Sequence, residues 1–143
     1  MNERSTAARL RRAGLRVTRQ RLLVADALIA AGRQMSAQEL YDGLRRRDRG
    51  IGRATAFRAL EGLVVAGVAR RMELENHVYG YIACRADHHH HLACQRCGRV
   101  EEIGEAYVAP VTRRIETDTG FRIDDARLDF YGECAACAAG QSA

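Results

Sequence analysis

Apolar residues recur at helical spacing through the first half of the chain, and this pattern predicts four helices. Glycines or charged runs follow these segments, as is typical where helices end. Phe57, Leu60, Leu63 and Val64 form the expected buried face of the last of them. The first helix is expected over residues 5–13, the second from Thr18 to about residue 31, the third from the capping-box sequence Ser36-Ala-Gln-Glu39 onward, and the fourth over about residues 54–66.

Two short apolar segments follow the fourth helix and predict a two-stranded hairpin. The strands are expected near residues 68–74 and 78–83, joined at Glu75-Asn76-His77. Helices followed by such a hairpin are the order of a winged helix-turn-helix domain, in which the last helix enters the major groove of DNA.

The pattern changes after residue 87, where short strands flank a single helix. Strands are expected at 88–92, 99–103, 121–123 and 127–131, and a helix over 105–119 with Val108, Val111 and Ile115 inward. Pro110 suggests that this helix begins nearer Ala109, because proline is harmless only in a first turn. We therefore expect an α+β chain: a winged helix-turn-helix domain over residues 1–83, a hinge over 84–87, and a small α/β metal-binding domain over 88–143.

Charge is divided between the two halves. All 23 basic residues are arginine, and residues 1–83 carry a net charge of +8 while residues 84–143 carry −3. A basic front half suggests a polyanion-binding module. No apolar run is long enough for a membrane span, and the arginine-rich first twenty residues lack the apolar core of a signal peptide. We expect a cytoplasmic protein with no membrane partner.

Two Cys-x-x-Cys pairs predict a structural metal site. Cys94, Cys97, Cys134 and Cys137 can supply four thiolates to one tetrahedral zinc ion. An odd count of five cysteines argues against a disulfide framework. A site with four protein ligands is closed, so its role is structural.

A second group of metal ligands lies between the halves, at Cys84 and in the run His88-His-His-His91. In a strand, side chains at i and i+2 point the same way, so His89 and His91 form one candidate pair and His88 and His90 the other. Cys84 is a soft ligand that favours zinc or a similar borderline ion. The chain lacks the His-Glu-x-x-His spacing of a zinc hydrolase, so we expect no enzyme and no small organic substrate. A zinc-storage protein would leave the basic front half without a role.

These residues carry a resemblance to the ferric uptake regulator family that spans roughly residues 8–137. The resemblance implies a metal-responsive repressor that binds double-stranded operator DNA as a homodimer, with residues 88–143 as the dimerisation domain. Its motifs are Tyr81-x-x-Cys84-x-x-x-His-His-His-His-Leu-x-Cys94-x-x-Cys97-Gly98-x-Val-x-Glu102 with the distal cysteine pair, and in the front half Gly14-Leu-Arg-Val-Thr18-x-x-Arg21, Ser36-Ala-x-Glu-Leu-Tyr41 and Ala54-Thr-Ala-Phe-Arg58-x-Leu60.

Particular positions are most like the zinc uptake regulator branch of that family. Cys84 matches the sensing cysteine of zinc regulators, whereas iron and peroxide sensors typically carry a histidine where this chain has Gln34. Arg70 replaces an acid found in some zinc regulators, and Ala109 and Ala126 replace ligands of an accessory site that would use His88 and His90. Sensing of iron, manganese, nickel or peroxide by the same fold, or zinc storage, remain the alternatives.

The resemblance and the spacing together suggest one structural and one regulatory zinc ion per protomer. Cys84, His89 and His91 are the expected regulatory ligands, with Glu102 favoured as the fourth because it follows the Cys97 knuckle. Glu73 is the alternative fourth ligand, and His77 a weaker one. Metal binding would favour one spacing of the two DNA-reading domains in a dimer, which is a population shift.

The DNA contacts are expected on and just before the second and fourth helices. Arg58 is expected to contact a base edge or a phosphate, and Phe57, which replaces the usual tyrosine, either a thymine methyl group or the core. The full expected set is Arg16, Arg19, Arg53, Thr55, Phe57 and Arg58.

Overall fold

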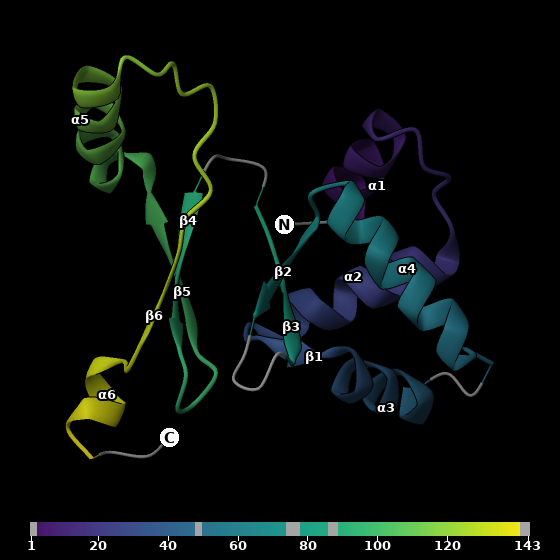
Figure 1. Cartoon of the computed structure of the whole chain (residues 1–143). Coiled ribbons are helices and arrows are strands. Elements are labelled where there is room, and N and C mark those ends of the chain that lie inside the picture. Colours follow the sequence, from purple (N-terminus) through teal and green to yellow (C-terminus); the bar gives the residue numbers. More distant parts are fainter. Residues whose placement is uncertain (1–2, 48–49, 74–77, 86–88, 141–143) are drawn as a thin grey trace. The chain divides into compact units, whose positions relative to one another are not determined.

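A computed structural model describes residues 3–47, 50–73, 78–85 and 89–140, and it divides the chain into two compact units (Figure 1). The N-terminal unit is Met1–Ala86 and the C-terminal unit is Asp87–Ala143. Both contain helices and strands, so the expected α+β fold class is confirmed. Among the helices in the described part of the chain, none is long and apolar enough to span a membrane.

The N-terminal unit contains the four expected helices. Local signals set their ends: the hydroxyl of Thr18 accepts a hydrogen bond from the Arg21 N–H at 3.3 Å and starts the second helix, which ends at Gly32 in the left-handed conformation. The helices are α1 (Glu3–Arg12), α2 (Arg19–Ala31), α3 (Ala37–Arg47) and α4 (Arg53–Val65).

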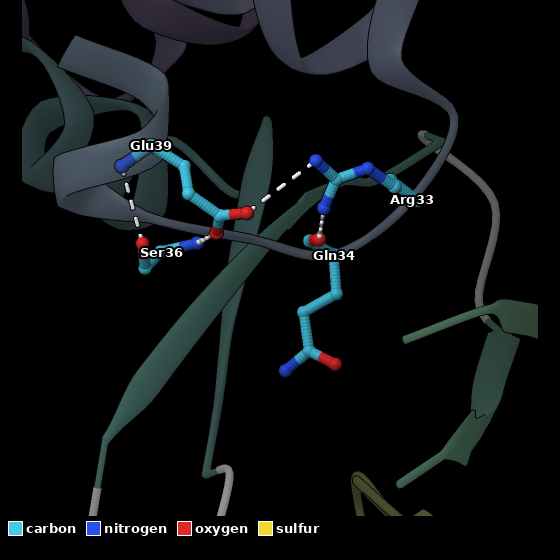
Figure 2. A network of polar contacts seen from close by, with 4 residues as sticks. All are labelled: Arg33, Gln34, Ser36 and Glu39. Carbon is cyan, nitrogen blue, oxygen red and sulfur yellow. Dashed lines mark hydrogen bonds and ion pairs between the residues drawn. The ribbon is translucent and has the colours of Figure 1, made fainter. Parts of the chain in front are cut away.

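Helix α3 begins with the predicted capping box (Figure 2). The Glu39 N–H donates to the Ser36 hydroxyl at 3.1 Å, and the Ser36 N–H donates to the Glu39 carboxylate at 2.7 Å. The Ser36 amide, together with the nearby Arg33 guanidinium, lowers the pKa of Glu39. The backbone N–H groups of Ser36 and Glu39 at the start of the helix therefore each donate to the side chain of the other residue.

The two predicted strands of the wing pair with each other, and a short third strand that was not predicted extends the sheet. Strands β2 (Ala69–Glu73) and β3 (Tyr79–Ala83) pair in antiparallel fashion, and β1 (Met35–Ser36) pairs with the other edge of β3, with Met35 opposite Tyr81. A two-residue strand has no periodicity of its own, so the sequence carries no signal for it. The expected turn at Glu75-Asn76-His77 lies outside the described residues.

The core of the N-terminal unit is apolar and well buried. In α4 the buried face differs from the predicted one: Leu60 and Leu63 are buried as expected, but Phe57 and Val64 are only partly buried. The small residues Ala56 and Ala59 turn toward the core instead. Fully buried core residues include Leu10, Val24, Leu28, Leu60, Leu63 and Val68.

The C-terminal unit contains a second three-stranded sheet in the order β5-β4-β6 (Figure 1). Strand β4 (His89–Cys94) pairs antiparallel with β5 (Val100–Gly104) and parallel with β6 (Asp129–Gly132). A short 3-10 helix, η2 (Glu105–Tyr107), precedes α5 (Ala109–Thr119), and α6 (Ala135–Ala138) follows β6. Pro110 lies in the first turn of α5, as its missing N–H requires.

Three expectations for this unit are wrong. Val108 is buried, but Val111 and Ile115 are 53% and 45% exposed rather than inward. Residues 121–123 form no strand, and the Ile123 N–H donates to the Glu116 carboxylate instead of to a ladder. The last strand begins at Asp129 rather than 127, and the four-residue helix α6 was not expected. Each difference depends on which elements meet in three dimensions, which periodicity does not specify.

Candidate metal centres and nucleic-acid interface

Four cysteine side chains converge at one end of the sheet in the C-terminal unit. The Sγ atoms of Cys94, Cys97, Cys134 and Cys137 all lie within 4.8 Å of one another, and those of Cys97 and Cys134 are 3.8 Å apart. Two thiolate ligands of a tetrahedral zinc ion, with bonds of about 2.3 Å, stand about 3.8 Å apart. The predicted set of four is therefore brought together at a spacing that suits one zinc ion.

The parallel pairing of β6 with β4 is what brings the two cysteine pairs together. It places Gly132 beside Cys94, and the Gln95 N–H donates to the Gly132 carbonyl oxygen at 2.8 Å. Arg96 also donates to the Cys137 carbonyl oxygen at 3.0 Å. These bonds hold the turn after β4 against the end of β6 and against α6.

The surroundings of these thiols have opposite effects on two of them. The Cys134 N–H donates to Cys94 Sγ at 3.3 Å, and this amide together with others nearby lowers the pKa of Cys94 to about 6. Burial, with the neighbouring thiols, raises the pKa of Cys137 to about 12. Zinc binds thiolates and displaces their protons, so the donor set suits zinc even where burial opposes ionisation.

The histidine pair predicted for a regulatory site lies on β4. The ring centroids of His89 and His91 are 4.8 Å apart, as expected for i and i+2 on one strand. Glu102 of β5 is the cross-strand neighbour of His91, and its Oε1 lies 3.6 Å from His89 Nε2. That distance is long for a hydrogen bond but close to the separation of about 3.4 Å between two N/O ligands of one tetrahedral zinc ion.

Asp129 is a functional candidate that the sequence did not reveal. It pairs in register with His91 across β4 and β6, and its Oδ1 lies 3.3 Å from His91 Nδ1. The two side chains are 17% and 1% exposed, respectively. A carboxylate only accepts, so Nδ1 carries the proton and the lone pair of His91 is on Nε2, a common orientation for a metal-ligating histidine. The only possible signal, the parallel pairing of β6, is not readable from the sequence.

His90 has a different role from its neighbours. It is fully buried; its Nδ1 accepts a hydrogen bond from the Leu128 N–H at 3.3 Å, and its Nε2 lies 2.9 Å from Glu105 Oε2. Both ring nitrogens are thus used within the unit, in the neutral form with the proton on Nε2. This arrangement makes His90 a structural link from β4 to η2. His88 lies outside the described residues.

The remaining candidate ligands belong to the N-terminal unit. Cys84 is buried, its N–H donates to the Val68 carbonyl oxygen at 2.8 Å, and it lies five positions before His89 in the chain. Glu73 is exposed at the end of β2, and His77 lies outside the described residues. The structure therefore gives Glu102 a histidine neighbour, His89, within its own unit.

Gln34 occupies the position where the resemblance would place a histidine in iron and peroxide sensors. Its side chain is buried and extends away from the capping box (Figure 2). It lies so close over Gly80 that a Cβ there would be 2.3 Å from Gln34 Nε2. In the part of the chain that the structure describes, neither atom of its amide group has a hydrogen-bond partner.

Three of the expected DNA contacts line one hollow in the N-terminal unit. Arg16, Thr55 and Arg58 lie around a cavity of about 590 Å³ between the start of α2 and the start of α4. Arg19 is exposed at the beginning of α2. The Arg53 guanidinium lies 5.6 Å from the centre of the half-buried Phe57 ring, a cation–π contact at the start of α4.

Arg21 also lines this hollow, although it was not among the predicted DNA contacts. Its Nη1 donates to the Arg16 carbonyl oxygen, and its guanidinium crosses α4 at Gly62, where a Cβ would be 2.9 Å from Nε. A glycine inside a helix costs stability, and here it leaves room for this arginine. The signal was present in the motif from Gly14 to Arg21, whose last residue holds the segment before α2.

A model of the ferric uptake regulator family matches residues 12–131, which is most of the chain. The chain belongs to the ferric uptake regulator family. Members of this family are metal-dependent transcription regulators and not enzymes, as the sequence predicted. The winged helix-turn-helix unit and the four-cysteine cluster described above are consistent with that membership.

Relatives from two branches of the family match the chain about equally well. It is 34% identical over 140 residues to the ferric uptake regulation protein of Neisseria meningitidis serogroup C, covering 97% of each chain. It is 34% identical over 125 residues to the zinc uptake regulation protein of Mycobacterium tuberculosis, covering 87% of this chain and 96% of that one. A solved zinc uptake regulator in complex with zinc and DNA is 26% identical, with a TM-score of 0.68 over 96% of this chain and 97% of the other.

Proposed function

We propose that this ferric uptake regulator family protein is a zinc-sensing repressor that binds operator DNA as a homodimer. The observation that carries the proposal is the cluster of His89, His91 and Glu102 on β4 and β5, with the Cys84 thiol a few residues earlier in the chain. A thiolate with two imidazoles and a carboxylate is a donor set that suits zinc.

The four-cysteine cluster would hold a second, structural zinc ion. Bound there, zinc would cross-link the turn after β4 to α6 and would add its binding free energy to the stability of the C-terminal unit. Cys94, Cys97, Cys134 and Cys137 fill all four positions, so this site is closed to substrates. It is the site that should keep its metal when the regulatory site is empty.

The regulatory ligands come from both units, and this origin suggests how metal binding would be coupled to DNA binding. Cys84 lies near the end of the N-terminal unit, whereas His89 and His91 belong to the C-terminal unit. A metal ion bound by Cys84 and by the histidines would restrict the chain segment that connects the two units. More of the dimers would then have their two DNA-reading units at the spacing that the operator requires. Without metal, apparent DNA affinity falls by the fraction of molecules in the competent state.

The arginine-lined hollow of the N-terminal unit supports the DNA side of the proposal. Arg16, Arg21 and Arg58 lie on one face between α2 and α4, and Arg53 and Phe57 lie on the first turns of α4. Arginines in such a place neutralise phosphates, and Arg58 is our candidate for a base contact. We therefore expect operator affinity to fall steeply as the salt concentration rises.

The homodimer is supported by apolar side chains that the C-terminal unit leaves exposed. Val111, Ile115 and Phe121 on and after α5 are 53%, 45% and 72% exposed. A second copy of the same unit would cover this face.

An iron sensor is the second candidate, because several relatives at similar identity are named ferric uptake regulation proteins. Two residues favour zinc over iron. Cys84 offers a thiolate, which is a softer ligand than a histidine. Gln34 stands where an iron sensor is expected to have a histidine. The choice between the two is therefore a question of metal preference at the same site.

The test is a metal titration of DNA binding. Operator duplexes would first be selected from a random pool with zinc-loaded protein, and binding would then be measured against free Zn²⁺, Fe²⁺, Mn²⁺ and Ni²⁺. We expect Cys84→Ser and Glu102→Ala to lose the zinc response while one zinc per protomer stays bound. Glu101→Ala is the matched control, because Glu101 is the preceding strand residue but pairs with Arg99 at 3.0 Å.

Two outcomes would contradict the proposal. Equal operator binding by metal-loaded and chelated protein would rule out the repressor mechanism. A Cys84→Ser variant that responds to zinc like the parent would remove the zinc-sensor assignment, and a stronger response to Fe²⁺ or Mn²⁺ would then identify the alternative.

A further inference from the structure

Arg9 of α1 joins two parts of the N-terminal unit that are distant in the sequence. Its Nη1 donates to the Cys84 carbonyl oxygen at 2.6 Å, and its Nη2 donates to the Gly67 carbonyl oxygen. The guanidinium is half-buried, and burial lowers the pKa of Arg9 while the nearby Cys84 raises it. One planar group therefore bridges Gly67, two residues after α4, and the proposed regulatory cysteine.

The bridged segments are already fixed by the backbone. Gly67 ends α4 in the left-handed conformation, and the Val68 N–H donates to the Leu63 carbonyl oxygen at 2.8 Å. The Cys84 N–H donates to Val68, the residue after Gly67. Arg9 adds a second tie on the other side of Cys84, so both the N–H and the C=O of this residue are held to the end of α4 or to α1.

A cation at this place is favoured by the end of α4. The C-terminal end of a helix carries partial negative charge, and Gly67, whose carbonyl oxygen accepts from Arg9, lies two residues beyond the last residue of α4. The fork of the guanidinium reaches two carbonyl oxygens at once, which the single ammonium of a lysine does not do in the same geometry.

We propose that Arg9 is a positioning residue of the regulatory metal site, which holds Cys84 in a fixed place relative to the DNA-reading helix α4. The inference rests on the proposed role of Cys84 as a metal ligand. With Arg9 in place, the thiol is pre-organised, so less ordering free energy is spent when metal binds. Because Arg9 also donates to Gly67, a metal that restricts the position of Cys84 would also restrict the end of α4.

The experiment compares Arg9→Gln with Arg11→Gln in the full-length protein with its structural zinc. Arg11 is an exposed arginine of the same helix, so both variants lose one positive charge from α1. Cobalt(II) is titrated while the sulfur-to-cobalt charge-transfer band is recorded, with Cys84→Ser defining the part of the band that belongs to Cys84. Operator binding is measured in parallel against free zinc.

We expect Arg9→Gln to raise the cobalt midpoint and the zinc midpoint of operator binding roughly five- to tenfold. Operator affinity at saturating zinc should equal that of Arg11→Gln, because the metal then supplies the missing order. Arg9→Lys should be intermediate, since it keeps the charge but reaches one carbonyl, and it decides the matter if Arg9→Gln does not fold.

Several results would overturn the inference. Equal midpoints for Arg9→Gln, Arg11→Gln and the parent would show that Arg9 does not position Cys84. A loss of operator affinity that is the same at every zinc concentration would show a general structural role instead. If the band of the parent protein equals that of Cys84→Ser, Cys84 does not bind the metal. That result would contradict the proposed regulatory site as well as this inference, and the Cys84→Ser comparison distinguishes it from the other outcomes.

Discussion

His90 and His91 are neighbours on β4, yet their partners give them different chemistry. Both ring nitrogens of His90 form hydrogen bonds, one with Glu105 and one with the Leu128 N–H. His91 uses Nδ1 on Asp129, which leaves Nε2 with the lone pair that a metal needs. At the residue scale, the assignment of a histidine as ligand or as structural link therefore follows from its hydrogen-bond partners and not from its place in a histidine run.

Replacing Asp129 tests this assignment. Asp129→Asn keeps the shape but removes the charge that orients His91 and makes it more basic, so regulatory zinc affinity should fall about tenfold. Competition with a zinc-binding dye, together with total metal content, would measure both sites separately. Asp125→Asn is the control, because Asp125 pairs with Arg127 at 2.9 Å on the surface. Equal affinities of the two variants would mean that Asp129 does not support the site.

At the element scale, helix α3 depends on signals within four residues, whereas helix α5 carries apolar side chains that its own unit leaves exposed. The capping box of α3 is complete in Ser36 and Glu39. Helix α5 has no buried residue, although Val111 and Ile115 repeat at helical spacing. An amphipathic helix without a buried face requires a partner.

Glu39→Ala should lower the free energy of unfolding by about 1 kcal/mol at pH 7, as loss of a cap does. The pKa of Glu39 is lower in the folded state, so its contribution is complete above the unfolded value of 4.5 and is lost as the pH falls through the folded value. Urea unfolding at pH 7 and near pH 3 should show a larger difference at the higher pH. Asp42→Ala, an exposed acid of the same helix outside the box, should show no such pH-dependent loss.

Val111→Asp should dissociate the proposed dimer, because it puts a charge into the face that a second copy would cover. Sedimentation velocity at micromolar concentration would report the monomer. Arg113→Asp is the matched control: residue 113 is also exposed, but it lies about 200° around the helix from residue 111. A dimer that survives Val111→Asp but not Arg113→Asp would place the interface on the other face of α5.

At the scale of the whole molecule, the two units differ in what stabilises them. The N-terminal unit has a continuous apolar core that includes Leu28, Leu60 and Leu63. In the described part of the C-terminal unit, the buried residues are mainly histidines and cysteines, with Ala93 and Val108. Burial of apolar area is the main favourable term in folding, so the second unit should depend on its metal far more than the first.

Removal of zinc should therefore unfold the units unequally. With a strong chelator, or in Cys94→Ser, we expect the amides of β4, β5 and β6 to lose their protection from hydrogen exchange while those of α2 and α4 keep it. Hydrogen exchange followed by mass spectrometry resolves the two units. Cys84→Ser should retain protection in both units. Full protection of β4 and β6 after complete removal of zinc would show that the four-cysteine site does not stabilise the fold.

The sequence by itself determined the features that depend on near neighbours in the chain. The helices of the N-terminal unit follow from apolar spacing, from Thr18 and from the Ser36–Glu39 box. Metal ligands were predicted from the Cys-x-x-Cys pairs and from the histidines at i and i+2. Turns and strands fix the separation of these side chains within a few residues. These interactions span so few residues that they have the same geometry in almost any tertiary context.

Only the tertiary structure decided which distant segments meet. The pairing of β1 with β3, the parallel pairing of β6 with β4 and the Arg9 link to Cys84 all join residues far apart in sequence. The outward face of α5 is one that such contacts within its unit leave exposed. Such contacts are selected by the summed packing and hydrogen bonding of the whole unit, and no local pattern encodes that sum. The ligand types were thus readable from the sequence, while the side chains that hold them in place were not.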